Sequence, residues 1–334
     1  MEARLVDELP SGSGWQFEPK WDGFRCLASR KGRRIDMSAK SGKTLARYFP
    51  EMVEQLAGLP VRNDTFVLDG ELAIPLGSTL DFEALQMRLH PAESRIRKLA
   101  RETPAIFIVF DLPIAPGGES LVDRPLTERR TALESFVAAL GPHSALRLSP
   151  CTRQRSTAQA WLNRAEGALD GIVAKRLDEP YLMGERGWLK IKRLRTADCV
   201  VGGFRYATDS SLVGSLLLGL YDDEGLLHHV GFTSGIANNA RAALTKKLEA
   251  LRGGPGFTGN APGGPSRWST ERSGQWQPLK PKLVAEVQYD HVTGNRFRHG
   301  TRFLRWRPDK APRQCTFDQL QSEARPSRLL SKIV

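Results

Sequence analysis

The chain has 334 residues, 40% of them hydrophobic, which is enough to form the cores of two ordinary domains. Apolar runs such as 105–110 and 216–220 are too short to cross a bilayer, and residues 1–10 lack the apolar core of a signal peptide. The cysteines lie far apart, without zinc-finger or redox spacing, so we expect four reduced thiols in a cytoplasmic protein: Cys26, Cys151, Cys199 and Cys315.

The net charge of +12 favours a polyanionic partner. Residues 195–334 hold 20 Lys and Arg against 12 Asp and Glu, which leaves +8 there and +4 before it. Between 291 and 313 seven basic residues are opposed only by Asp309. A basic stretch is also typical of a solvated surface, so charge alone opens the nucleic-acid hypothesis without deciding it.

In the first half, short apolar runs alternate with helical patterns, which indicates an α+β fold. The predicted strands are 14–18, 24–28, 65–72, 105–112 and 171–175. The predicted helices are 48–56, 82–89, 127–140 and 157–164.

After about Lys192 the pattern changes to closely spaced strands with one helix. The predicted strands are 199–205, 215–221, 226–232, 283–291 and 302–307. The helix is 238–252, and the Gly-, Pro- and Ser-rich segment 253–277 is predicted to be an exposed loop. Short strands with a single helix favour a small OB-type barrel, a fold often used for nucleic acids.

The first segment with chemical meaning is 18–25, Glu-Pro-Lys-Trp-Asp-Gly-Phe-Arg. Its Lys-x-Asp-Gly places Lys20 at a turn between two predicted strands, where a phosphate can approach the backbone. A lysine is a nucleophile only when deprotonated, so we expect burial or neighbouring cations to lower the pKa of Lys20. On its own, the tetrapeptide is equally typical of a surface turn.

Five further segments follow in chain order. Segments 68–72 and 107–112 end buried strands with acids, and 170–175 begins with Asp-Gly. In 188–192, strand alternation directs Lys190 and Lys192 to one face, where an anion such as a triphosphate would relieve their repulsion. The sixth is 305–310, Arg-Trp-Arg-Pro-Asp-Lys.

In this order, and along nearly the whole chain, the six segments resemble the motifs of the covalent nucleotidyltransferases, the superfamily of DNA ligases and mRNA-capping enzymes. Residues 283–310 are similar to ATP-dependent DNA ligases, and 184–198 resembles the bacterial LigC ligases and the LigD ligase domain. The resemblance implies a nucleotidyltransferase (adenylation) domain, 1–193, and an OB-fold domain, 194–334.

The resemblance also implies that Lys20 is the catalytic residue that attacks the α-phosphate of ATP and carries AMP. Phe110 would stack on adenine, with Ile172 and Val173 near the other face, whereas Phe107 is interpreted as a core residue. Arg307 and Lys310 would close over ATP and orient pyrophosphate. The full implied ATP-binding set is Glu18, Arg25, Lys40, Glu71, Phe110, Val173, Lys190, Lys192, Arg307 and Lys310.

Magnesium or manganese would bind near Glu71 and Asp170, since hard cations accompanying phosphates prefer carboxylates. Two departures from the family pattern bear on these roles. Asp170 stands where the family usually has Glu, and its side chain is one methylene shorter. Ala39-Lys40 stands where a Ser-Arg is usual, and Lys40 can neutralise charge without making a bidentate contact.

The implied function is the sealing of 3′-OH/5′-phosphate breaks in duplex DNA by a monomer at the nucleoid, without a membrane partner. Repair is the expected setting, with Ku as a candidate recruiting partner. One alternative is an RNA ligase or a capping-type enzyme. The other is a non-catalytic OB-fold nucleic-acid-binding protein, which would have no need for Lys20, Glu71 and Lys190 together.

Overall fold

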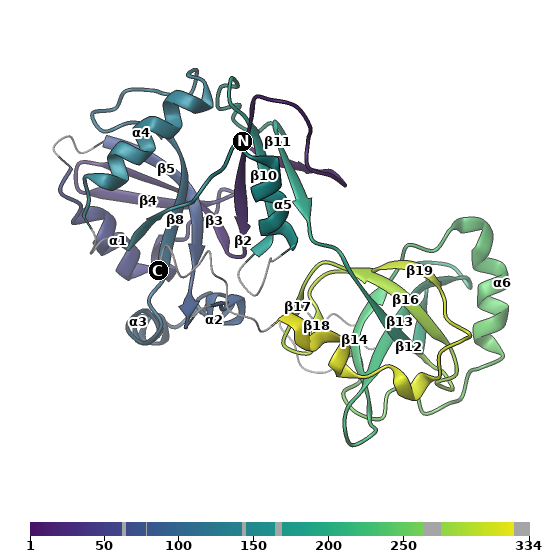
Figure 1. The fold of residues 1–334 in the computed structure, drawn as a ribbon. Coiled ribbons are helices and arrows are strands. Elements are labelled where there is room, and N and C mark those ends of the chain that lie inside the picture. Colours follow the sequence, from purple (N-terminus) through teal and green to yellow (C-terminus); the bar gives the residue numbers. More distant parts are fainter. Residues whose placement is uncertain (62–64, 78, 142–144, 164–168, 264–274, 324–334) are drawn as a thin grey trace. The chain divides into compact units, whose positions relative to one another are not determined.

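A computed structural model describes residues 1–61, 65–77, 79–141, 145–163, 169–263 and 275–323. The described residues form two compact units, Met1–Arg193 and Leu194–Glu323 (Figure 1). The predicted loop 253–277 lies partly outside them, as do residue 164 of a predicted helix and the end of the second domain, 324–334. No helix in the described residues is long and apolar enough to cross a membrane.

The first unit contains two sheets. The five-stranded sheet has the order β4-β3-β5-β8-β9, with β3 Phe24–Lys31, β4 Arg34–Ala39, β5 Thr65–Ala73, β8 Ile106–Ile114 and β9 Leu146–Leu148. The four-stranded sheet has the order β1-β11-β10-β2, with β1 Ala3–Leu5, β2 Trp15–Trp21, β10 Leu169–Arg176 and β11 Trp188–Lys192. Only the turn at Asp22 and Gly23 separates β2 from β3, so the Lys-x-Asp-Gly segment connects the two sheets.

Helices cover the five-stranded sheet, and the main core of the unit lies beneath them. Phe49, Leu72, Leu85, Phe107 and Leu133 are all completely buried in this core. The helices are α1 Pro50–Ala57, α2 Phe82–Met87, α3 Glu93–Glu102 and α4 Leu126–Ala138, and α5 Arg155–Asn163 packs on β2 and β10 instead. A 3-10 turn, Ala46–Tyr48, and the short strands β6 Pro75–Leu76 and β7 Thr79–Leu80 complete the unit.

Each predicted strand and helix of the first half overlaps an observed one, but helix α3 and the strands β1, β4, β6, β7 and β9 were not predicted. Helix α3 buries only Ile96 and Ala100, and charged residues fill most of its other positions. So narrow an apolar stripe gives a weak helical signal.

The second unit is a small antiparallel barrel of the OB type. Its sheet has the order β14-β13-β12-β16-β19, and β15 also pairs with β12. The strands are β12 Arg195–Tyr206, β13 Val213–Tyr221, β14 Leu227–Thr233, β15 Gln277–Pro278, β16 Val284–Tyr289 and β19 Arg302–Trp306, with a hairpin of β17 Val292–Thr293 and β18 Arg296–Phe297. Helix α6, Asn238–Glu249, packs on β13, and two 3-10 segments follow, Pro312–Gln314 and Phe317–Glu323.

Candidate active site

Both sheets of the first unit contribute to one pocket. Eight of the predicted site residues line it: Glu18, Lys20, Arg25, Lys40, Glu71, Phe110, Val173 and Lys190. Glu2, Ala3, Pro19, Trp21, Lys175 and Trp188 complete the lining. The pocket therefore gathers acids, bases and aromatic rings from strands that are far apart in the sequence.

Lys20 lies near the end of β2, opposite Gly171 of β10. Gly171 has a φ of 145°, and an added Cβ would lie 2.0 Å from the carbonyl oxygen of Ile191, so only glycine allows the strands to approach this closely. That close approach is to β11; on the β2 side of β10, the Lys20 Nζ lies 2.7 Å from Oδ2 of Asp170. The nucleophile candidate is thus held by strand pairing and by an ion pair.

The expectation of a lowered pKa for Lys20 is wrong. Burial lowers the pKa of Lys20, but attraction by Asp170, Glu71 and Asp22 outweighs burial and raises it. From the sequence, only desolvation and nearby cations were expected to act on the pKa of Lys20. The carboxylates come from other strands or from the following turn, and their effect depends on the folded arrangement.

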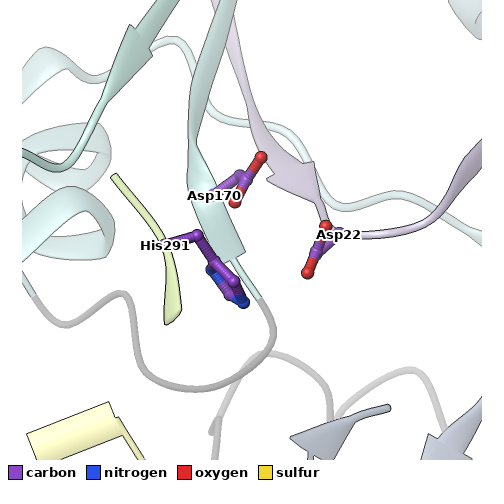
Figure 2. A group of neighbouring side chains, drawn as sticks. All are labelled: Asp22, Asp170 and His291. Atoms are coloured by element: carbon purple, nitrogen blue, oxygen red, sulfur yellow. The ribbon is translucent and has the colours of Figure 1, made fainter. Parts of the chain in front are cut away.

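Three carboxylates act on Lys20: Glu71 lines the pocket, whereas Asp22 and Asp170 do not. Figure 2 shows Asp22 just beyond β2 and Asp170 in β10, and their carboxylate oxygens lie within 4.8 Å of each other. Burial raises the pKa of Glu71 to about 8, against the opposing effect of Lys20 and Arg25. The paired carboxylates of Asp22 and Asp170 suit a hard divalent cation, whereas Glu71 does not belong to this close group. Asp22 was not among the predicted metal residues, although it belongs to the Lys-x-Asp-Gly segment.

A buried ion pair forms another side of the pocket. Oε2 of Glu18 lies 2.8 Å from Nζ of Lys175, and both side chains are almost fully buried. The Lys175 ammonium also lies 4.6 Å from the ring centre of Phe110 and 4.2 Å from that of Trp188. Gln16 donates a hydrogen bond of 2.8 Å to Glu18. These contacts fix the Glu18 carboxylate beside two aromatic rings.

The orientation of β8 and β10 separates core residues from pocket residues. Phe107 is fully buried in the main core, as expected, and Phe110 lines the pocket. Val173 also lines the pocket, but Ile172 does not. Adjacent strand residues point to opposite faces, and Ile172 packs into the core behind the four-stranded sheet. Ile172 is therefore a core residue and not a lining residue of the pocket.

Arg25 is held by residues that received no predicted role. Its Nε donates to Oδ1 of Asp69 over 2.7 Å, and its Nη2 donates to Oδ2. The Tyr181 hydroxyl donates to the same Oδ2 over 2.6 Å. The Arg25 guanidinium also lies 5.3 Å from the Phe110 ring centre and 4.9 Å from that of Trp188. Asp69 and Tyr181 thus fix Arg25 against the aromatic side of the pocket.

The rim of the pocket is basic. Nζ of Lys40 lies 3.0 Å from a carboxylate oxygen of Glu2, and Arg186 lies 3.6 Å from the same oxygen. Burial and then the neighbouring cations, led by Lys192, lower the pKa of Lys190. A polyphosphate would relieve this repulsion, as the sequence argument held. Lys192 follows Lys190 on the same face of β11 but does not line the pocket.

The remaining two predicted ATP-binding residues belong to the second unit. Arg307 directly follows β19, and Lys310 ends the same segment. Asp198 of β12 accepts hydrogen bonds from both: from Arg307 over 3.0 Å and from Lys310 over 2.8 Å. Asp309 pairs with Arg307 at 2.7 Å. Glu286 lies 3.9 Å from Arg307, so the two cations form a local cluster with three acids.

Two family models match most of the chain. The family model "ATP dependent DNA ligase domain" matches residues 4–192, and "ATP dependent DNA ligase C terminal region" matches residues 209–310.

Among curated relatives, DNA ligase C2 of Mycolicibacterium smegmatis is 43% identical, over 99% of this chain and 96% of the relative. DNA ligase C of Mycobacterium tuberculosis is 41% identical, over 96% and 93%. The multifunctional non-homologous end joining DNA repair protein LigD of the same species is 30% identical, over 95% of this chain and 37% of its own length.

A solved structure from work on the DNA binding of Lig E DNA ligases shares the fold, with a TM-score of 0.56 and 17% identity over 92% of this chain and 99% of that one. With two ligase models matching most of the sequence, the chain belongs to the family of ATP-dependent DNA ligases.

Proposed function

We propose that this DNA ligase works through a covalent AMP on Lys20. Nζ of Lys20 would attack the α-phosphorus of ATP, so that a P–N bond forms and the bond to the pyrophosphate oxygen breaks. The adenylate would then pass to a 5′-phosphate in duplex DNA. Attack by the adjacent 3′-OH would form the phosphodiester and release AMP. The observation that carries this proposal is the position of Lys20 between the carboxylates and the basic rim of one pocket.

The proposed adenine site is the aromatic side of the pocket. Phe110 would stack on the base, with Val173 near its other face. Glu18, fixed by Lys175, would lie beside the base. Arg25, fixed by Asp69, and Glu71 would contact the ribose end of the nucleotide. The buried charges are already paired before a ligand binds, so the site is preorganised.

The proposed phosphate site is the basic side. Lys190 and Lys192 would hold the α-phosphate and stabilise the charge that develops on it, while Lys40 would neutralise charge at the rim. The proton of Lys20 must leave before attack, and Asp170, at 2.7 Å, is placed to accept it. Arg307 and Lys310 would orient the pyrophosphate, which requires the second domain to approach the pocket in this step.

Glu71 and Asp170 would hold a magnesium or manganese ion, with Asp22, whose carboxylate lies within 4.8 Å of that of Asp170, as a further ligand. Such an ion supplies positive charge that polarises the phosphate and offsets the carboxylates that keep Lys20 protonated. We assign the adenylation domain to residues 1–193 and the OB-fold domain to residues 194–334. The net charge of the second domain suits the backbone of nicked or broken duplex DNA.

We further propose that the enzyme acts in repair at the nucleoid, with Ku as a candidate recruiting partner. The support is the similarity to the LigD end-joining protein. Joining of linear DNA by the purified ligase, with and without Ku, tests the recruitment. A rate that Ku leaves unchanged would contradict it.

The central test is mass spectrometry of the protein after incubation with ATP and magnesium. We expect a single added adenylate in the wild type and none in Lys20→Ala. GTP in place of ATP should give no adduct. An adduct that persists in Lys20→Ala would refute the assignment.

Nick sealing on defined DNA and RNA duplexes tests the substrate. DNA nicks should be sealed, and binding should weaken steeply with salt because basic residues release counterions from the backbone. Preference among nick sequences should be slight, since such contacts position the duplex without reading bases. Preferential sealing of RNA, or a flat salt titration, would favour a different ligase class.

A further inference from the structure

In the second unit, Asp198 binds both cations of the segment 307–310, which we call the basic segment. The Asp198 side chain, about 11% exposed, accepts hydrogen bonds from Arg307 at both oxygens, each over 3.0 Å. Oδ2 also accepts a hydrogen bond of 2.8 Å from the ammonium group of Lys310. Arg and Lys are long side chains with many rotamers. The carboxylate of Asp198 therefore limits the rotamers that Arg307 and Lys310 can adopt.

Asp198 is itself firmly held. It lies on β12, in register with Glu286 of the neighbouring β16. The side-chain amide of Gln319 accepts a hydrogen bond from the Asp198 backbone N–H over 2.9 Å and donates to its carbonyl over 3.1 Å. The backbone is thus fixed by the sheet and by a side-chain clamp, so the carboxylate is a rigid support for the two cations.

Asp198 also offsets the repulsion between the positive charges of Arg307 and Lys310. These two cations lie three residues apart and share the negative charge of Asp198. Glu286 lies 3.9 Å from Arg307 alone. Asp309 pairs only with Arg307 in the described contacts, and its side chain is 61% exposed, so it offers weaker support. Lys310 uses one of its three N–H groups on Asp198, which leaves donors for an anion.

We propose that Asp198 is a positioning residue for self-adenylation, which keeps Arg307 and Lys310 directed together toward the same anionic group. The proposal rests on the role of these two cations in orienting pyrophosphate. Asp198 would not touch ATP. It would lower the cost of bringing two flexible cations into one geometry in the step that expels pyrophosphate.

The test uses the full chain with Asp198→Asn, which keeps the shape and removes the charge, and with Asp198→Glu, which restores the charge. Single-turnover self-adenylation is measured over a series of ATP concentrations, beside sealing of a nick that already carries a 5′-adenylate. We expect Asp198→Asn to slow self-adenylation at saturating ATP about tenfold and to change pre-adenylated sealing less than about twofold. Asp198→Glu should recover part of the loss.

Asp222→Asn is the matched control. Asp222 also lies in the second unit and also pairs with a basic side chain, His228 at 2.7 Å, but it has no contact with the basic segment in the described residues. It should leave both rates within about twofold. In the double variant Asp198→Asn/Arg307→Ala, self-adenylation should be little slower than in Arg307→Ala alone, because coupled residues are not additive.

Three outcomes would overturn the proposal. Faster self-adenylation in Asp198→Asn would mean that Asp198 masks the two cations. An equal loss of rate in self-adenylation and in pre-adenylated sealing, with a lower melting temperature, would mean that Asp198 has a structural role. An unchanged rate, while Arg307→Ala and Lys310→Ala are slow, would refute the positioning role alone. If those two variants were also unimpaired, the assigned role of the basic segment would be wrong as well, whereas the lysyl-AMP would still be tested separately by Lys20→Ala.

Discussion

The two units hold their functional cations in different ways. In the first unit, Lys20 and Lys175 lie on paired strands, and Lys175 is enclosed with its acid partner. In the second unit, Arg307 and Lys310 follow the end of a strand, are about a fifth exposed, and depend on Asp198. A pocket fixed by strand register is present throughout the reaction. Cations on a segment beyond the sheet suit a contact needed in one step only.

The largest test of this contrast separates the steps of the reaction. Arg307→Ala and Lys310→Ala should slow self-adenylation some hundreds-fold, about 3–4 kcal/mol of barrier, because pyrophosphate leaves only in that step. Both should largely spare sealing of a pre-adenylated nick. Lys192→Ala should impair both activities, since the α-phosphate is present throughout. Equal loss of both activities in the Arg307 and Lys310 variants, with folding intact, would assign the segment to DNA binding.

A second test concerns the two faces of β8. Phe110→Ala should weaken ATP use by about 1–3 kcal/mol, the range of aromatic–base stacking. Phe107→Ala is the matched control on the opposite face and should mainly lower the melting temperature, as expected for a large side chain removed from a core. ATP titration of self-adenylation and thermal unfolding of both variants give the answer. The reverse pattern would place the nucleotide elsewhere.

The smallest expected effect is a difference in pH response. Burial, with Arg296 and Arg205, lowers the pKa of His229 to about 3, and in the described residues its Nε2 has no hydrogen-bond partner. The unfolded chain therefore takes up a proton below about pH 6.5 while the folded unit does not. Stability is full above that pH and is lost as pH falls toward 3, by about 2 kcal/mol between pH 6.5 and 5. His229→Gln should remove this part of the acid sensitivity in denaturant titrations.

Glu71 in the first unit should act in the opposite direction. Its folded pKa of about 8 lies above its ordinary value, so its contribution to stability is full below about pH 4.5 and is lost as pH rises through 8. Glu71→Gln, unfolded without metal or nucleotide, should flatten the alkaline side of the profile, and His229→Gln the acid side. If either variant changed the other side, the assignment of the titrating group would fail.

Much of this architecture could be predicted from the sequence because the motifs lie on strands with clear apolar patterns. The places of Lys20, Phe107 and Phe110 follow from alternation along β2 and β8. Helix α3 was missed because its apolar stripe is too narrow.

Which side chains form ion pairs and hydrogen bonds with one another could not be predicted, because that depends on which strands pair in the fold. Glu18 and Lys175 are 157 positions apart and become neighbours only through the pairing of β2 with β10. Asp69 and Tyr181, and likewise Asp198 and Lys310, are also far apart in the sequence and meet only in the fold. The wrong direction for the Lys20 pKa has this cause too, because Asp170 reaches Lys20 across that pairing.

The buried pair of Glu18 and Lys175 has an evolutionary consequence. A substitution of either residue alone leaves a charge buried without its counter-ion, which costs about 3–5 kcal/mol, a large part of the stability of a typical domain. A lineage can therefore change this part of the pocket only by replacing both residues together. The rim is under no such constraint, because a charge such as that of Lys40 is exposed there. We expect descendants of this gene to vary at the rim long before they vary at the pair.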